Sequence, residues 1–401
     1  MPAGHHTTAL RILASAVAMV VVAALAGTMG RAAADQTGPG RAFGPGRCGP
    51  IDASYVRGAN ATGGQILPLG PTEVGAAAPL MAASFNAETV FWATAPLTSS
   101  GQTITVPVDG VTSRVAFVLS TDGSIANVTV TDPRGTLVTA GTGVEAFNFG
   151  CVRGFAVDQP LSGEWTVQAA GTGTYWFIVH ARTDLGLDDA AFVQVAGRPA
   201  HEGLFKIPGE PVAGRPATLR ARVTREHVTD ATFDLVSLDG ARLQAIELSP
   251  VTASSTEEEY VGEIANLPSI PFRVRVSGRD RTGAVYQRFS GRSFHAATVE
   301  VLAPQTVTLA RGQQTPVTVS VRNVGGPVQL QIVAAFNATV LRVEPATLQL
   351  SANEARDVTV WADVPANGTL LSSDIVVSAA SPTDPAAANS AIIPATLDAV
   401  P

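Results

Sequence analysis

Residues that carry chemistry are scarce in this chain of 401 residues. It has two cysteines, six histidines and four tryptophans, and aromatic residues make up 6% of it. Charged residues make up 15%, and the formal net charge of −7 argues against a nucleic-acid partner, because phosphate binding needs a basic surface. Glycine (38) and proline (27) are plentiful by contrast. The composition is typical of short strands joined by turns, and the length suits about three domains of roughly 100–150 residues.

Catalytic and metal-binding motifs are also missing. The sequence contains no Gly-x-Ser-x-Gly motif and no two histidines at a zinc-ligand spacing. We interpret Ser162 as a turn residue and His180 as a structural histidine at the end of a strand. We therefore expect no enzyme, no cofactor and no catalytic residue. A hydrolase whose site is assembled from unrecognised loops is one alternative.

The N-terminus predicts export. Arg11 precedes an apolar run over residues 12–26, and small residues lead to a plausible Ala-x-Ala cleavage site before Asp35. This pattern predicts a signal peptide over residues 1–34, with a retained anchor as the alternative, and no membrane span after its removal. We expect a secreted, periplasmic or extracellular protein. Residues 35–47 are rich in Gly, Pro and Arg and predict a disordered leader.

The predicted export bears on the redox state of the two cysteines, Cys48 and Cys151. Disulfides persist outside the cytoplasm, so we expect these residues to be bonded to each other, with two buried free thiols as the alternative. A loop of about 100 residues closed in this way contributes on the order of 4 kcal/mol.

Strand patterns dominate the chain after its first hundred residues. Alternating apolar positions on both sides of the Gly-Thr-Gly-Thr turn at 171–174 predict a hairpin over 163–181, with Trp165 and Trp176 on one buried face. Short strands with turn signals between them continue along the chain, for example over 218–224, 272–277 and 286–289. Ile392 and Ile393 are candidates for a last strand within the Ala/Pro-rich tail. The fold class predicted is mainly β, with tandem antiparallel β-sandwiches.

The patterns also predict the domain boundaries. A short α/β segment over 48–98 precedes a first sandwich at 99–197, a second at 198–298 and a third at 299–401 with a flexible tail. The α/β segment contains the one short helix that we expect, near the N-terminus over residues 71–85. Its predicted apolar face consists of Val74, Ala77, Ala78 and Met81.

Four stretches in order resemble the region that follows the von Willebrand factor A domain in hemicentin-like extracellular proteins. They are residues 59–67 with 72–74, 129–135, 160–167 and 272–289. The resemblance implies a galactose-binding-like, jelly-roll-like sandwich followed by an immunoglobulin-like domain, and the third domain also looks immunoglobulin-like. The first stretch looks like the last strand and last helix of the A domain. Residues 35–58 are too few to hold that domain and lack its Asp-x-Ser-x-Ser metal loop, so its metal site is not carried over.

Two ligand classes remain open. Asp184, Asp188 and Asp189 are candidate calcium ligands in one short segment, with a solvated acidic loop as the alternative. Trp92 and Trp361 are the only loosely placed candidates for stacking on a sugar, although packing in a core or at a strand edge is the favoured interpretation.

The sequence thus predicts a non-enzymatic, exported module for structure, adhesion or protein interaction. Its expected partner is a protein or a component of the cell surface or matrix. A carbohydrate- or calcium-dependent binding protein is the alternative, beside the hydrolase named above.

Overall fold

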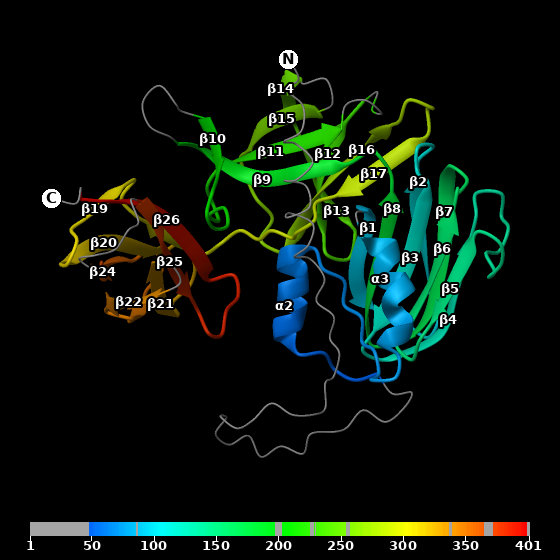
Figure 1. Cartoon of the computed structure of the whole chain (residues 1–401), viewed down its shortest axis with the longest axis horizontal. Helices are drawn as coiled ribbons and strands as arrows, with labels where there is room; N and C mark the ends of the chain where they lie inside the picture. Colours follow the sequence, from blue (N-terminus) through cyan, green and yellow to red (C-terminus); the bar gives the residue numbers. More distant parts are fainter. Residues whose placement is uncertain are drawn as a thin grey trace. The chain divides into compact units, whose positions relative to one another are not determined.

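A computed structural model describes residues 48–85, 87–196, 203–224, 228, 230–253, 257–336, 339–364 and 372–398. The predicted signal peptide and leader lie outside these residues. The chain forms two compact units, of which unit 1 combines residues 1–190, 221–261 and 272–293, and unit 2 combines 191–220, 262–271 and 294–401. Strands dominate both units (Figure 1), which confirms the mainly β fold class.

The first sandwich of unit 1 has the strand order of a jelly roll. One sheet has the order β1 (Glu88–Pro96), β8 (Thr174–Arg182), β3 (Arg114–Thr121), β6 (Val152–Asp158) and β5 (Val144–Asn148). The other has the order β2 (Gln102–Val108), β7 (Gly163–Thr172) and β4 (Ser124–Thr131). Strands β1 to β4 alternate between the two sheets, as do β6 to β8, which is jelly-roll connectivity. The predicted boundary at residue 99 falls after β1, although β1 pairs with β8 along its length.

The predicted hairpin over residues 163–181 is wrong. Strand β7 pairs with β2 and β4, whereas β8 pairs with β1 and β3, so the turn between them crosses from one sheet to the other. Gly173 makes the crossing possible, because its φ is +87° and a Cβ there would lie 2.5 Å from the backbone nitrogen of Gly123 in the neighbouring crossing. Trp165 and Trp176 consequently belong to different hydrophobic clusters.

Helices cover the outer face of the larger sheet. The helix predicted at 71–85 is present as a 3₁₀ turn, η1 (Gly75–Ala77), and α3 (Ala78–Ser84). Its buried residues are Ala77, Leu80 and Ala83, which pack on Ala116 and Val118 of β3, so the predicted apolar face was rotated. None of the helices that the structure describes is long and apolar enough to cross a membrane.

A second helix, α2 (Ala53–Thr62), replaces the expected turn and strand of an A domain. The Asp52 carboxylate accepts a hydrogen bond from the backbone N–H of Ser54 at 2.7 Å, and Gly63 ends the helix with a φ of +74°. These are an N-cap and a left-handed C-cap, which together define a helix locally. Ile66 and Leu67 are fully buried but form no strand.

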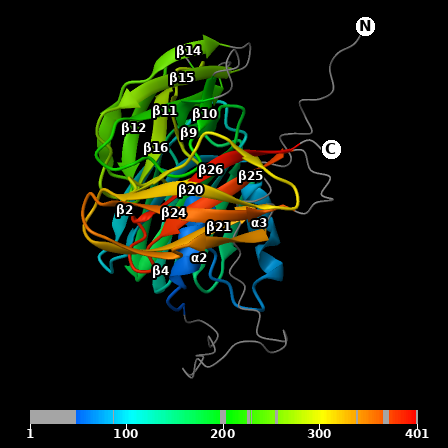
Figure 2. The same ribbon diagram turned by 90° about the vertical axis from the view of Figure 1, so that its left-hand side faces the viewer.

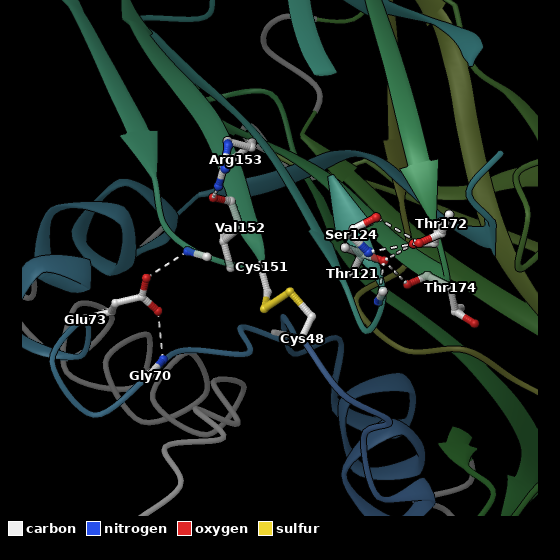
Figure 3. The surroundings of a disulfide bond; sticks show 12 residues. Cys48, Gly70, Glu73, Thr121, Ser124, Cys151, Val152, Arg153, Thr172 and Thr174 are labelled. Carbon is white, nitrogen blue, oxygen red and sulfur yellow. Dashed lines mark hydrogen bonds between the residues drawn. A yellow bond between two sulfur atoms is a disulfide. The ribbon is translucent and has the colours of Figure 1, made fainter. Parts of the chain in front are cut away.

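The predicted disulfide is confirmed between Cys48 and Cys151. Figure 3 shows the carboxylate of Glu73 beside it, joining two loops. Its Oε2 accepts from the backbone N–H of Gly70 at 2.8 Å, and its Oε1 accepts from that of Gly150 at 2.7 Å. The disulfide and Glu73 therefore attach the helical segment to the loop before β6.

Strands of the predicted second sandwich form two further sheets together with β9, which falls before the predicted boundary at residue 198. One has the order β13 (Arg242–Ile246), β12 (Thr232–Ser237), β16 (Phe272–Arg279) and β17 (Val285–Phe289). The other has the order β10 (Gly203–Lys206), β9 (Leu187–Ala196), β11 (Ala217–Thr224), β15 (Glu257–Ile264) and β14 (Ser249–Ala253). The predicted strands over 218–224, 272–277 and 286–289 coincide with β11, β16 and β17.

A buried ion pair joins the β13–β17 sheet to the jelly roll within unit 1. Arg288 Nη2 donates to Asp109 Oδ2 at 2.6 Å, and neither side chain has any exposed area. Arg288 also donates from Nε to the carbonyl oxygen of Leu185 and from Nη1 to that of Gln287. The second carboxylate oxygen of Asp109 accepts from the hydroxyl of Thr112 at 2.9 Å. The pair is thus almost fully hydrogen-bonded, which is the condition for a buried charge to be tolerated.

A buried cation–π contact lies at the same junction. The guanidinium carbon of Arg273 is 4.0 Å from the ring centroid of Trp92, and Arg273 Nη1 donates to the carbonyl oxygens of Ser290 and Gly291. Burial lowers the pKa of Arg273 to about 9, so the side chain is still protonated at neutral pH. Trp92 packs there with Ala59 of α2 and Phe289 of β17.

Unit 2 contains the C-terminal sandwich, strands β18 to β26 (Figure 2). Its strand order is β18 (Val299–Leu302), β20 (Gln314–Asn323), β24 (Ala355–Asp363), β22 (Thr339–Glu344), β21 (Val328–Phe336), β25 (Ser372–Ala380), β26 (Ala388–Leu397) and β19 (Val307–Leu309), and β23 (Thr347–Leu350) also pairs with β21. Strand β22 pairs with β21 in its first half and with β24 in its second, so it links two sheets that enclose one hydrophobic core.

The end of this sandwich confirms the candidate last strand at Ile392 and Ile393 and corrects the prediction of a flexible tail. Residues 388–397 form β26, which pairs along its whole length with β25. Ile393 is fully buried, and Ala391 and Ala395 are buried on the same side of the strand. These three residues, at alternate positions of β26, fill part of the core between the two sheets. The alanine- and proline-rich composition of the segment resembles that of a linker.

We predict that Arg288→Met lowers the free energy of unfolding by about 3–5 kcal/mol, because it leaves the buried Asp109 carboxylate unpaired. Arg342→Met is the matched control, since Arg342 pairs with Glu344 on the surface, where such a pair contributes about 0–1 kcal/mol. Urea denaturation of both variants measures the difference. Equal losses in the two variants would show that the Asp109–Arg288 pair is not what joins the two parts of unit 1.

Candidate functional site

His180 is buried and makes no hydrogen bond from Nδ1 to a carboxylate of the described residues. It is 8% exposed, its Nδ1 has no hydrogen-bond partner, and burial lowers its pKa to about 4. A catalytic triad needs the Nδ1–H of its histidine to donate to a carboxylate, which His180 does not do. His201 and His227 lie outside the described residues.

The three aspartates predicted as weak calcium candidates do not converge. Asp184 lies between β8 and β9 and lines a hollow of about 520 Å³ together with Phe85 and Arg182. Asp188 and Asp189 are successive residues of β9, so they project to opposite faces of that strand. Asp189 Oδ2 is 3.6 Å from Arg222 Nη2. In the part of the chain that the structure describes, no three His, Cys, Asp or Glu side chains form a group able to hold a metal ion.

Neither tryptophan considered for sugar stacking has an unobstructed aromatic face, because an arginine guanidinium lies over each ring. Trp92 is 2% exposed beneath Arg273, so it is a core residue. Trp361 is half-buried on β24, with the guanidinium of Arg342 4.6 Å from its ring centroid. Its Nε1–H donates to Glu344 Oε2 at 3.1 Å. Trp361 is therefore engaged in a surface cluster with its cross-strand neighbours.

The feature that stands out is an exposed aliphatic row on the C-terminal sandwich. Val340 of β22, Ala335 of β21, Val376 of β25 and Ile392 of β26 lie opposite one another in register across four strands. Val333 lies two residues from Ala335 on the same side of β21. The exposed fractions are 72% for Val340, 51% for Val333, 40% for Val376 and 43% for Ile392. We call these five residues the aliphatic face.

On strands β21, β25 and β26 the surroundings of the aliphatic face carry almost no charge. The other outward-facing residues of β21, β25 and β26 in the described part of the chain are uncharged except Asp374. The second sheet of the same sandwich differs, since its outward positions include Arg322, Arg342, Asp357 and Asp363. The outer side of a sandwich strand is usually polar, so aliphatic residues there need a reason other than packing within the sheet.

Sequence reasoning missed the aliphatic face. Residues 339–344 were not predicted as a strand, and no inward or outward side was assigned to the neighbouring strands. A signal was present in the pairs Val376-Val377 and Ile392-Ile393, because two adjacent residues of a strand cannot both face the same core. One member of each pair had to face outward, and only the pairing of the strands shows that these members meet.

Comparison with known proteins gives one distant relative. No family model matches the chain. The chain is 25% identical over 358 residues to the von Willebrand factor A domain-containing protein 7 of Rattus norvegicus. The aligned region covers 82% of this chain and 39% of that relative. The chain therefore spans about two fifths of the length of that relative. This agrees with the predicted resemblance to proteins that contain an A domain.

Similarity to solved structures is weak. A Bacillus licheniformis lipase in its propeptide form is 12% identical with a TM-score of 0.25, covering 51% of this chain and 43% of that chain. The ectodomain of mouse nectin-like molecule 4 is 14% identical with a TM-score of 0.18, covering 72% of this chain and 95% of that chain.

The buried state of His180 predicts a pH dependence. Unfolded histidine has a pKa near 6.5, whereas that of His180 in the folded protein is about 4. Between these values only the unfolded chain takes up the proton, so stability falls as the pH drops from 6.5 to 4 and does not depend on His180 above 6.5. We expect a loss of about 3 kcal/mol from this residue. Urea denaturation of the wild type and of His180→Leu at both pH values isolates it, and equal pH dependence would contradict the assignment.

We predict that calcium does not stabilise the protein. A filled calcium site at 100 times its Kd would add about 2.7 kcal/mol to the free energy of unfolding. That increment would raise the melting temperature by several degrees, whereas we expect a difference below about 1 °C between excess calcium and excess EDTA. The measurement is a thermal melt of the chain without its predicted signal. A rise of several degrees that disappears in Asp188→Asn with Asp189→Asn would restore the calcium interpretation.

Proposed function

We propose that this chain is a non-enzymatic, exported module for protein interaction, with a structural or adhesive role outside the cytoplasm. The aliphatic face carries the proposal. Contiguous exposed aliphatic residues on a folded domain are typical of a surface that another protein covers. Depletion of charge around such a patch is typical of the centre of an interface.

The construction of unit 1 suits an exported protein. Unit 1 is joined internally by a buried ion pair and a disulfide, and disulfides are retained in oxidising compartments. The predicted signal peptide and the name of the distant relative support a location outside the cytoplasm. We retain the division into three sandwiches and the hemicentin-like arrangement as parts of this proposal, with β1 added to the first sandwich and β9 moved to the second. The expected partner is a protein or a component of the cell surface or matrix.

The proposal predicts that one substitution on the aliphatic face removes binding. The fluorescently labelled chain is titrated onto intact cells and extracellular matrix of the producing organism. Val376→Glu should weaken binding at least tenfold, because it places a charge in the centre of an apolar contact. Val285→Glu is the matched control, since Val285 is 47% exposed on strand β17 of unit 1.

Three outcomes would count against the proposal. The wild-type chain could bind none of these surfaces, or the two variants could bind equally well. Binding that is abolished by EDTA or by free sugars would favour the calcium- or carbohydrate-dependent alternative.

A further inference from the structure

We infer that the aliphatic face pairs with the same face of a second copy of this chain, forming a weak two-fold symmetric dimer. The inference rests on the proposed function, because it assigns a specific occupant to the same surface. Four observations favour a second copy: the size of the surface, its charge, the polar residues at one end of it and the edges of the sheet.

The surface is large enough for a weak dimer. Strands β21, β25 and β26, spaced about 4.8 Å apart and about nine residues long at about 3.4 Å per residue, cover a face of about 14 by 30 Å, and the first half of β22 adds about 5 by 10 Å. Two such faces bury about 1,000 Å², which is in the range of weak, transient interfaces. The free surface ends on its β26 side near Ser390, whose hydroxyl donates to the carbonyl oxygen of Pro208 at 2.9 Å. This size predicts a dissociation constant in the micromolar range rather than a permanent dimer.

The distribution of charge allows the aliphatic faces of two copies to meet. The whole chain carries a formal net charge of −7, so two copies repel each other at most orientations. The outward residues of β21, β25 and β26 include only one charged side chain, Asp374, among those described. On β22 the outward residues after Val340 are Arg342 and Glu344, which pair with each other in the half of the strand that joins β24. A two-fold axis that runs across the strands places the two Asp374 carboxylates at opposite ends of the interface. The two copies can therefore approach there without like charges meeting.

The polar end of the surface is also self-complementary. Gln329 and Gln331 of β21 and Gln349 of β23 are exposed at the end opposite Asp374, and Gln329 and Gln349 lie opposite each other in register. With the axis across the strands, this end of one copy lies over Asp374 of the other. Glutamine amides donate to a carboxylate and also donate to and accept from one another, so both ends find partners.

The edges of the sheet favour contact through its face. The terminal strands in the pairing order are β18 with four residues and β19 with three. Very short edge strands are a known means of preventing strand-to-strand association. Pro394, which is exposed on β26, also lacks the N–H that a further strand would need. Face-to-face packing of two sheets, about 10 Å apart, is the remaining mode for this part of the sandwich.

Analytical ultracentrifugation of the chain without its predicted signal tests the inference. Between about 1 and 300 μM the weight-average mass should rise from one chain towards two, with a midpoint in the micromolar range that matches a small interface. Val376→Glu and Ile392→Glu should each remain monomeric to the highest concentration. Val285→Glu adds the same charge on another exposed strand position and should dimerise like the wild type. Circular dichroism and a thermal melt verify that the variants fold, since Val376 and Ile392 both lie on the solvent side of their strands.

A wild-type chain that stays monomeric throughout this range would overturn the inference. Dimers of Val376→Glu as tight as those of the wild type would overturn it too, because the contact would lie elsewhere. Equal weakening by Val285→Glu would show that added charge, rather than this face, decides the mass. A monomer whose binding to cells or matrix is still lost in Val376→Glu would reject only the second copy as the occupant and leave the proposed function standing.

Discussion

The structure of unit 1 depends on a buried ion pair in which both charged groups keep their hydrogen-bond partners. Removing a guanidinium and a carboxylate from water costs several kcal/mol each, and their attraction offsets this only when the geometry is good and the remaining polar atoms are bonded. Arg288 donates hydrogen bonds to the Asp109 carboxylate and to the carbonyl oxygens of Leu185 and Gln287. The Asp109 carboxylate also accepts a hydrogen bond from the Thr112 hydroxyl. The loop after β2, the turn after β8 and strand β17 must therefore all be in place together. The neighbouring contact between Arg273 and Trp92 relies on the same alignment.

The two sandwiches show how the covering of a sheet decides its role. In the jelly roll, β3 and β8 are buried on both faces, because α3 covers one part of the outer face and α2 with the β13–β17 sheet covers another. Strand β8 accordingly reads as one continuous apolar run. In the C-terminal sandwich, the equivalent surplus of aliphatic residues, including Val376 and Ile392, is exposed. The same sequence feature is thus packing in one place and a surface available for recognition in the other.

Polar side chains that suggested chemistry are used for structure instead. His180 is buried in its neutral form, Trp92 lies beneath a guanidinium, and Trp361 donates its N–H to Glu344. Each of these side chains is buried or half-buried within its own sandwich or at the junction inside unit 1. The aliphatic face differs from these groups, because its residues on β21, β25 and β26 are surrounded by uncharged side chains except Asp374.

The sequence by itself determined the mainly β class, the positions of most strands and the disulfide, because turn residues, alternation and a single pair of cysteines are local or countable features. It could not determine that β7 and β8 belong to different sheets, since a glycine turn within a hairpin and one that crosses a sandwich look alike locally. It also could not show that Val340, Val376 and Ile392 meet in one row. Register across strands depends on contacts between residues far apart in the chain, so only the tertiary structure brought the aliphatic face together.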